Sequence, residues 1–214
     1  VLTGKGLSWG GSLGRKEATG YGAVYFAQNM LAARGETLEG KTCLVSGAGN
    51  VAIYTIEKLY ELGARPITCS DSRGTIHDPS GIDLELLKRL KEVERVSLEA
   101  YLRERPEALY VPAHDYPSDG HAVWRIQGDV AFPCATQNEL TECDAKVLIE
   151  NGVRCISEGA NMPSTKAAVE HFLAAKLAYG PGKAANAGGV ATSQLEMAQN
   201  SSMEQWPLAK VDKK

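Results

Sequence analysis

A glycine-rich turn between a β-rich run and a helical run is the feature that most narrows what this chain can fold into. Residues 41–73 read KTCLVSGAGNVAIYTIEKLYELGARPITCSDSR. Their patterns predict three elements in order: a strand at 42–46, a helix at 52–62 that stops at Gly63, and a second strand at 66–69 that ends at Asp71. This order predicts a βαβ unit with parallel strands.

The turn itself, Gly-Ala-Gly-Asn-Val-Ala at 47–52, matches the pattern G-x-G-x-x-[GA]. Gly47 permits a sharp turn, Gly49 lets backbone N–H groups approach a pyrophosphate, and small Ala52 allows close packing of helix on strand. The start of the helix favours an anion, because its N–H groups are unpaired and its dipole is positive there. Asp71 stands where an acidic residue usually meets the adenosine ribose. These features predict dinucleotide binding; the alternative is an ordinary βαβ turn that needs glycine only for its geometry.

Length and composition indicate one α/β domain. The chain has 214 residues, of which 43% are hydrophobic and 23% charged, with a net charge of −3. This charge gives no reason to expect nucleic acid or an anionic membrane as a partner. No apolar run approaches the roughly 18 residues of a membrane span, and the N-terminus has no signal pattern, so we expect a cytoplasmic protein. Because residues 1–13 begin without Met, we also expect a piece of something longer.

Cysteine and histidine show no ligand spacing. The five cysteines are Cys43, Cys69, Cys134, Cys143 and Cys155, with no C-x-x-C pair. Three of them fall inside predicted strands, where a thiol behaves as a small buried hydrophobe. The four histidines are scattered, so we predict no metal site.

The segments on either side of the βαβ unit have weaker patterns. Residues 12–35 predict a helix with Ser12 as N-cap and Gly35 as terminator. Gly20 and Gly22 inside it indicate close approach of a ligand or of a neighbouring backbone. The remaining segments are a turn-like stretch at 74–81, two amphipathic helices with solvated charged faces at 82–93 and 97–103, and a loop-like, least ordered stretch at 112–128.

The second half alternates strands and helices. Strands are expected at 129–132, 153–157 and 176–179, and helices at 142–150, 164–175 and 191–200. This alternation predicts a Rossmann-type, doubly wound, mostly parallel sheet with helices on both faces. The loops that follow the strands contain Asn138, Asn161 and Asn186, whose amides suit a carboxamide and ribose hydroxyls. Such loops share one edge of the sheet, so a cleft is expected there. No His, Lys or Cys has an obvious partner for acid–base or nucleophilic work.

Five motifs carry a resemblance to a known family. They are GRKEATGYG at 14–22, SGAGNVA at 46–52, PCATQNE at 133–139, SEGANMP at 157–163 and PGKAANAGGVATSQLEMAQN at 181–200. In this order the chain closely resembles the glutamate dehydrogenase family over essentially its whole length, particularly the hexameric microbial type. The resemblance implies reversible oxidative deamination of L-glutamate to 2-oxoglutarate and ammonia, with hydride transfer to or from a nicotinamide.

The resemblance also implies roles for residues. Thr19 would lie near the nicotinamide, and Val190 and Ser193 would meet the substrate side chain and its carboxylate. The pyrophosphate would be held by Gly47, Gly49, Asn50 and Val51, and the nicotinamide ribose and carboxamide by Ala135, Thr136, Asn161 and Asn186. The resemblance implies that the family's catalytic lysine and aspartate belong to an amino-terminal domain that residues 1–214 do not include, and that the family's last helices are cut off near Lys214. We therefore predict that residues 1–214 form one dinucleotide-binding domain, which binds cofactor but does not turn over substrate. The whole enzyme is expected to be a homohexamer, and this chain by itself a monomer.

The cofactor is predicted to be NADP, with NAD as the alternative. Asp71 by itself favours NAD, because a carboxylate accepts from a ribose 2′-OH and repels a 2′-phosphate. Ser72 and Arg73 follow at once, and a guanidinium suits a phosphate. Two further functions stay open: a non-catalytic NADP(H) sensor, and the cofactor domain of a leucine, valine or phenylalanine dehydrogenase.

Overall fold

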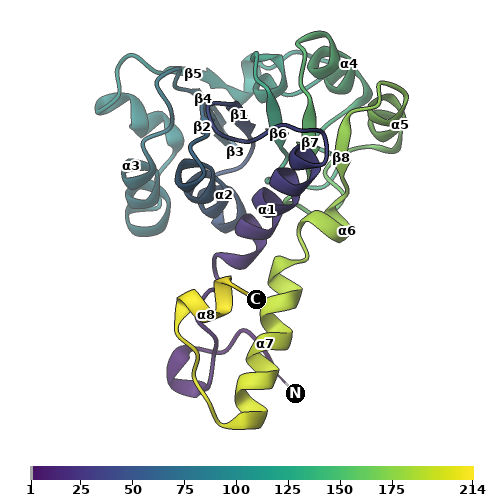
Figure 1. Cartoon of the computed structure of the whole chain (residues 1–214). Helices are drawn as coiled ribbons and strands as arrows, with labels where there is room; N and C mark the ends of the chain where they lie inside the picture. Colours follow the sequence, from purple (N-terminus) through teal and green to yellow (C-terminus); the bar gives the residue numbers. More distant parts are fainter. Residues whose placement is uncertain (1) are drawn as a thin grey trace.

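A five-stranded parallel sheet forms the centre of the chain, of which the computed structural model describes residues 2–214 (Figure 1). Its strand order is β2-β1-β6-β7-β8, and all four pairings are parallel. The strands are β1 (Thr42–Val45), β2 (Arg65–Pro66), β6 (Val130–Phe132), β7 (Cys155–Ser157) and β8 (Ala178–Gly180). The predicted α/β class with a mostly parallel, doubly wound sheet is therefore confirmed.

Helices cover both faces of this sheet, and each face has its own core. Alternate residues of a strand point to opposite faces. Cys43 and Val45 of β1 accordingly pack in one core, which includes residues of α1 (Ala18–Ala32) and α2 (Asn50–Glu61). Leu44 packs in the other core, which includes residues of α4 (Glu142–Glu150) and α5 (Lys166–Ala174). Burial on both faces explains why the strands are continuous apolar runs.

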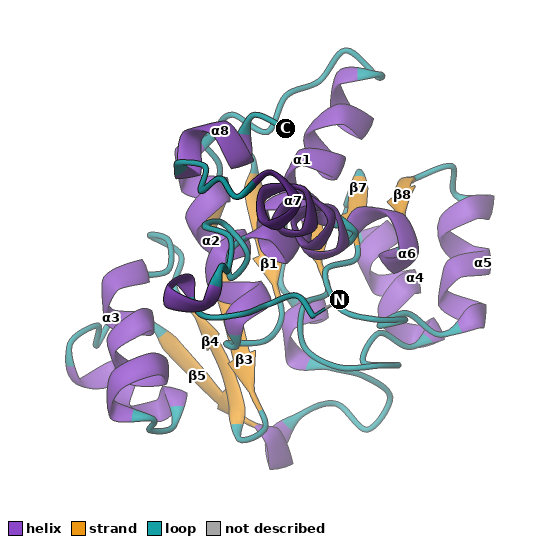
Figure 2. Ribbon diagram, turned by 90° about the horizontal axis from the view of Figure 1, so that it is seen from below, coloured by secondary structure: helices purple, strands orange, loops and turns teal. Residues whose placement is uncertain are grey.

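A second sheet, which the sequence patterns did not predict, lies beside the first. It is an antiparallel meander of β3 (Thr68–Asp71), β4 (Gly74–His77) and β5 (Leu109–Pro112). The prediction of a turn over 74–81 is thus wrong for residues 74–77, which form β4. These four residues have a weak strand pattern of their own, and the hydrogen bonds that make them a strand come from β3 and β5 on either side. Figure 2 shows this sheet next to α3 (Leu84–Lys88), at the opposite end from β8.

The predicted strand at 66–69 is divided between the two sheets at Ile67. There the Thr68 hydroxyl accepts from the backbone N–H of Val45 at 2.8 Å and donates to its carbonyl at 3.0 Å. The side chain replaces the ladder bonds at the point where the chain leaves the parallel sheet. Asp71 consequently ends β3, beside the glycine turn, where Ser70 N–H donates to the Gly47 carbonyl.

Helix α1 begins at Ala18, so the prediction of a helix from Ser12 is wrong at its start. The Ser12 hydroxyl accepts from the side-chain amide of Gln199 at 2.8 Å and caps no helix. The glycines inside α1 are explained by neighbouring backbones rather than by a ligand. A Cβ on Gly20 would lie 2.6 Å from the Thr55 nitrogen, and one on Gly22 would lie 3.0 Å from the Gly188 Cα.

The segments before and after β5 contain short helical pieces. The predicted helix at 82–93 is α3 followed by a π-helical turn, Arg89–Glu94, and the next is a 3₁₀ helix, Leu98–Arg103. The stretch 112–128 starts at Pro112, the last residue of β5, and continues with two 3₁₀ turns, Ala113–Asp115 and Ala122–Arg125. This stretch nevertheless contributes the fully buried Trp124 to the second core. The prediction that 112–128 is the least ordered part of the chain does not account for this buried side chain.

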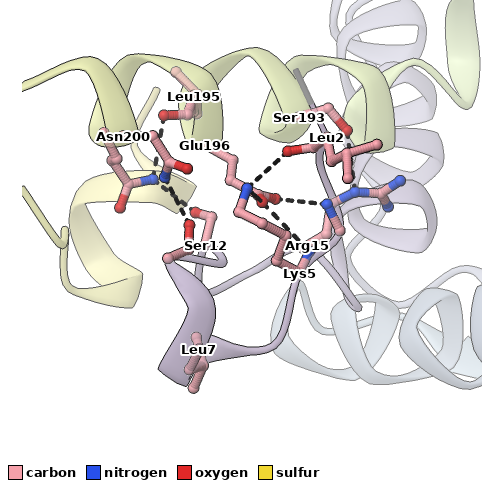
Figure 3. Close-up of polar contacts among 12 residues, drawn as sticks. Leu2, Lys5, Leu7, Ser12, Arg15, Ser193, Leu195, Glu196 and Asn200 are labelled. Carbon is pink, nitrogen blue, oxygen red and sulfur yellow. Dashed lines mark hydrogen bonds and ion pairs between the residues drawn. The ribbon is translucent and has the colours of Figure 1, made fainter. Parts of the chain in front are cut away.

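The last helices and the first residues lie together, away from the sheet (Figure 1). After α6 (Gly182–Ala185), α7 (Gly188–Ser202) runs outward, and α8 (Leu208–Asp212) folds back toward α1. The first residues, including a 3₁₀ turn at Leu7–Trp9, pack along α7. Gly4 and Lys5 donate backbone hydrogen bonds to the fully buried Glu196 carboxylate, which ties the two ends of the chain together (Figure 3).

The strand cysteines are buried, as predicted for small apolar side chains. Cys43, Cys69 and Cys155 are each fully buried in a strand, and burial raises the pKa of the Cys155 thiol to about 12. All five cysteines are unpaired thiols. Over residues 2–214 we find no helix with the length and apolar character that crossing a membrane requires.

Candidate functional site

Loops at the carboxyl ends of the parallel strands line a cleft with two chambers. One chamber, of about 610 Å³, contains Asn161 and Asn186 and is called the amide chamber. The other, of about 630 Å³, contains the turn Gly47-Ala48-Gly49 and is called the glycine chamber. Both touch the loop that follows β6 at residues 134–136. The position agrees with the rule that open α/β sheets bind ligands beyond the carboxyl ends of their strands.

Most of the predicted site residues lie in these walls. The amide chamber is lined by Thr19, Val51, Ala135, Thr136, Asn161 and Asn186, and also by the predicted substrate residues Val190 and Ser193. The glycine chamber is lined by Gly47, Gly49, Asp71 and Ser72, with Ala135 and Thr136 again. The fold therefore brings together side chains that are up to 174 positions apart, from Thr19 to Ser193.

The glycine turn has the geometry that its pattern predicts. Gly47 has a φ of +84°, which favours glycine, and a Cβ there would lie 2.9 Å from the Cys134 carbonyl oxygen. Its N–H is already used, since it donates to the Ser70 hydroxyl at 2.9 Å. The N–H groups left for an anion are those of the first turn of α2, which have no partner within the helix. A Cβ on Gly49 would meet no atom within 4 Å, so the turn faces open space.

Asn50 is close to the turn but its side chain points elsewhere. Its amide donates to the Lys16 carbonyl at 2.5 Å, and neither chamber wall includes it. This bond connects the start of α2 to the segment before α1. Any contact of Asn50 with a pyrophosphate would therefore come from its backbone N–H.

Two of the three amides that follow the strands form a pair. The Asn186 side chain donates to the Asn161 side-chain oxygen at 3.0 Å and to the Ala160 carbonyl at 3.3 Å. The pair leaves donor and acceptor positions for a carboxamide or hydroxyl in the amide chamber. Asn138 is not part of it. Its φ is +56°, its side chain is exposed, and its N–H donates to the Met162 carbonyl.

Glu158 holds the loops of the amide chamber in place. Its side chain is buried at the end of β7 and accepts from the Tyr179 hydroxyl at 2.9 Å and from the Gly182 N–H at 2.7 Å. These bonds join the loop after β7 to β8 and α6. Burial and the neighbouring Glu158 carboxylate raise the pKa of Tyr179, which keeps its hydroxyl a donor.

Arg15 is a residue of the amide chamber that sequence reasoning missed. Its Nε donates to the Ser193 hydroxyl at 3.2 Å, as Figure 3 shows. Ser193 in turn donates to the Gly189 carbonyl at 3.0 Å. Among residues 2–214, Arg15 takes part in none of the ion pairs. The motif GRKEATGYG contained the signal, because a guanidinium beside the cleft suits an anionic ligand.

Asp71 lies in the glycine chamber with much of its hydrogen-bonding capacity already used. Its carboxylate accepts from Lys91 Nζ at 2.9 Å, from the Leu98 N–H at 3.1 Å and from the Arg73 N–H at 2.9 Å. Burial by itself would raise the pKa of Asp71, but these hydrogen bonds outweigh it and the net effect lowers the pKa. Asp71 is therefore a carboxylate with a positive partner.

Lys91 is the second cleft residue that sequence reasoning missed. It belongs to the segment 82–93, for which the sequence predicts an amphipathic helix with a solvated charged face. The structure instead places Lys91 in the glycine chamber with Asp71 and Ser72. Arg73, expected there, has an exposed side chain and is absent from the walls of the described cleft.

Comparison with known proteins establishes the family. The sequence model of the family described as Glutamate/Leucine/Phenylalanine/Valine dehydrogenase matches residues 10–214 of this chain. The chain belongs to this family. The resemblance inferred from five sequence motifs is therefore confirmed.

Similar proteins of this dehydrogenase family come from bacteria. The chain is 60% identical to the NADP-specific glutamate dehydrogenase of Helicobacter pylori strain J99, over 100% of this chain and 48% of that protein. It is 52% identical to the NADP-specific glutamate dehydrogenase of Haemophilus influenzae, over 99% of this chain and 46% of that protein. The chain thus spans about half the length of the curated relatives it matches.

Solved structures of glutamate dehydrogenases share the fold. Superposition on the Plasmodium falciparum enzyme gives a TM-score of 0.93 at 44% identity, over 99% of this chain and 44% of that one. A further glutamate dehydrogenase structure gives 0.91 at 38% identity, over 100% of this chain and 47% of the other. The α/β fold of this chain therefore corresponds to somewhat less than half of each of these glutamate dehydrogenase chains.

Proposed function

We propose that this chain is the dinucleotide-binding domain of an NADP-dependent glutamate dehydrogenase, which interconverts L-glutamate with 2-oxoglutarate and ammonia. The observation that carries the proposal is the cleft, in which a glycine turn at a helix start and a pair of asparagines lie in adjoining chambers. The first suits a pyrophosphate and the second a nicotinamide carboxamide. The relatives named NADP-specific glutamate dehydrogenase support the choice of substrate and cofactor.

The residues of the chain would hold each part of the cofactor. The N–H groups at the start of α2 would bind the pyrophosphate, and Asn161 and Asn186 would orient the carboxamide so that one face of the ring meets the substrate. The nicotinamide, when bound, supplies the hydride chemistry. Thr19 and Val51 line the wall on which the ring and its ribose would rest. The loops fixed by Glu158 would help to exclude water from the reacting face.

Arg15 and Ser193 support a dicarboxylic substrate. A guanidinium without a carboxylate partner among the described residues, beside a hydroxyl in the amide chamber, suits the side-chain carboxylate of glutamate or 2-oxoglutarate. An aliphatic or aromatic substrate side chain would leave this cation uncompensated. We therefore favour glutamate over leucine, valine or phenylalanine.

Lys91 and Ser72 support NADP. A ribose 2′-phosphate that enters the glycine chamber beside Asp71 would meet the Lys91 ammonium, which also screens the Asp71 charge. Binding of the 2′-phosphate by Arg73 stays a prediction, and the exposed position of Arg73 does not favour it.

We further propose that the described residues bind cofactor but do not complete the reaction. The ionisable side chains that line the amide chamber are Arg15 and Cys134, and burial raises the pKa of the Cys134 thiol to about 12. Neither suits acid–base work near neutral pH. The catalytic lysine and aspartate that the family resemblance implies would then come from the other half of the relatives' length.

Calorimetric titration of the purified chain with NADPH and with NADH tests the proposal, together with an assay of glutamate oxidation. We expect tighter binding of NADPH than of NADH, and no turnover. Binding of neither dinucleotide would contradict the cofactor site, and measurable turnover would contradict the division of the active site. If the chain binds ADP-ribose, which lacks the nicotinamide, with the same affinity as NADPH, the result would favour the alternative of a sensor that recognises only the adenine half.

The assembly and location of the whole protein stay predictions. A homohexamer for the whole enzyme and a monomer for this chain can be checked by light scattering. A cytoplasmic location can be checked by cell fractionation.

A further inference from the structure

Glu139 lies in the wall of the glycine chamber and shapes the place where the two chambers meet. Its Oε1 accepts from the backbone N–H of Ala135 at 2.9 Å and from that of Thr136 at 3.3 Å. Ala135 and Thr136 line both chambers. The Glu139 carboxyl group therefore helps to fix the conformation of this loop, together with the bond from the Cys134 N–H to the Ser46 hydroxyl.

The other oxygen of Glu139 is in an unfavourable position for a charge. Oε2 is buried and has no hydrogen-bond partner among the described residues. A charged oxygen without a partner is costly to bury, and a proton on it reduces that cost to the smaller cost of an unpaired hydroxyl. Burial raises the pKa of Glu139 to about 7, although the nearby Ser46 hydroxyl and the N–H groups of Ala135 and Thr136 favour the charged form.

Among residues 2–214, the wall of the glycine chamber contains no unpaired cation that would compensate a negative charge on Glu139, and Arg125 is paired with Asp144 at 3.4 Å. Asp144, in the first turn of α4, raises the pKa of Glu139 further. In the same chamber, Lys91 is paired with Asp71. Burial lowers the pKa of His121 to about 4, so that this side chain is neutral near pH 7.

The other titratable groups of the glycine chamber are also neutral near pH 7. Burial raises the pKa of the Cys134 thiol to about 12. Burial likewise raises the pKa of the Tyr116 hydroxyl, which is hydrogen-bonded to Thr75. The neutral and charged forms of Glu139 are thus balanced mainly by burial.

We infer that Glu139 is a positioning residue that shapes the cleft in its neutral form and takes up a proton when the dinucleotide binds. The inference rests on the proposed function of the cleft. A bound dinucleotide excludes water from the chamber and brings a negative pyrophosphate near the carboxyl. Both changes disfavour the carboxylate. Binding above pH 7 is therefore linked to protonation of Glu139, and the affinity for the dinucleotide falls as the pH rises.

Calorimetric titration with NADPH at pH 7.5, in two buffers that differ in ionisation enthalpy, measures this proton directly. The variant Glu139→Gln keeps an oxygen for the two N–H groups but cannot take up a proton, and Glu139→Ala removes the acceptor. We expect a net uptake of part of a proton by the wild-type chain and less by Glu139→Gln, which binds within about threefold of wild type. We expect at least about tenfold weaker binding by Glu139→Ala, because two N–H groups lose their acceptor.

Two controls make the result decisive. NADH lacks the 2′-phosphate, which itself titrates near pH 6 as phosphate monoesters do, so the difference between wild type and Glu139→Gln must persist with NADH. If Glu139→Gln does not fold, infrared difference spectra of the wild-type chain must show a protonated carboxyl band that grows on binding.

The outcomes separate this inference from the proposed function. Equal proton uptake by wild type and Glu139→Gln, or wild-type affinity in Glu139→Ala, overturns the role of Glu139 and leaves the cofactor site intact. Failure of the wild-type chain to bind either dinucleotide overturns both.

Discussion

At the scale of single residues, the partner of a charged group matters more than its position in the sequence. Asp71 stands where a ribose-binding acid is expected, yet Lys91 and two backbone N–H groups already bind its carboxylate. A lysine that looks like part of a solvated helix face instead lies in the cleft. The choice of cofactor therefore depends on the pair of Asp71 and Lys91 and not on Asp71 alone.

Lys91→Met is expected to weaken NADPH binding much more than NADH binding. Loss of a charged hydrogen bond costs about 1.5–3 kcal/mol, which corresponds to roughly tenfold to a hundredfold in affinity. NADH should bind as well as before or better, since Asp71 is then free to accept from the 2′-OH. Calorimetric titration of both cofactors measures this. Arg73→Met is the control and should change neither affinity by more than about threefold. A larger loss of NADPH binding in that control would return the phosphate to Arg73.

At the scale of elements, close packing between helix backbones positions the cleft. Helix α1 carries Thr19 into the amide chamber while its glycines let α2 and α7 approach it. The glycine turn meets the loop after β6 in the same way, at Cys134. Glycine therefore has two different roles in this chain, which substitution to alanine can separate.

Gly20→Ala and Gly49→Ala form such a matched pair. A Cβ on Gly20 would lie 2.6 Å from the Thr55 nitrogen, so α1 and α2 must separate, and we expect a loss of about 1–3 kcal/mol of unfolding free energy. A Cβ on Gly49 meets no protein atom within 4 Å, so stability should change by less than about 1 kcal/mol while NADPH binding weakens. Urea unfolding and calorimetry measure the two effects. The opposite pattern would show that the turn faces packed protein rather than ligand.

At the scale of the whole molecule, a buried carboxylate helps to hold the first residues against α7, together with hydrogen bonds from Gln199 and Asn200. Glu196 accepts from Lys5 Nζ at 2.5 Å and from the N–H groups of Gly4 and Lys5, more than 190 positions away in sequence. Burial by itself would raise the pKa of Glu196, but the Lys5 ammonium and these N–H groups outweigh it, so the pKa is lowered. Because the folded value is the lower one, this contact stabilises the fold above the ordinary glutamate pKa of about 4.3, and the stabilisation is lost as the pH falls through the lowered value.

Glu196→Gln should loosen this contact at neutral pH. Replacing the charged acceptor is expected to cost about 1–3 kcal/mol and to speed amide exchange in both α7 and the segment 2–11. Glu170→Gln, on the exposed face of α5, should cost less than about 0.5 kcal/mol. Hydrogen exchange followed by mass spectrometry locates the effect. Unchanged exchange in the first residues of Glu196→Gln would contradict a tether through this side chain.

The sequence by itself determined the parallel sheet, the glycine turn and the order of strands and helices after residue 129. These features follow from local causes: an apolar run buried on both faces, a position that requires positive φ, and helical periodicity. Motif order likewise determined the family, and with it most residues of the cleft. The sequence was less successful where the cause is not local, as for β4, the start of α1 and the anchoring of Trp124.

Only the tertiary structure decided which charged and polar groups meet. Two of these contacts join distant parts of the chain, Arg15 with Ser193 and Lys91 with Asp71. The third, between Glu139 and the loop that it supports, depends on burial that no local sequence pattern reports. The physical reason is that burial and hydrogen bonding determine the charge and the free donors of such groups, and both depend on how the elements pack.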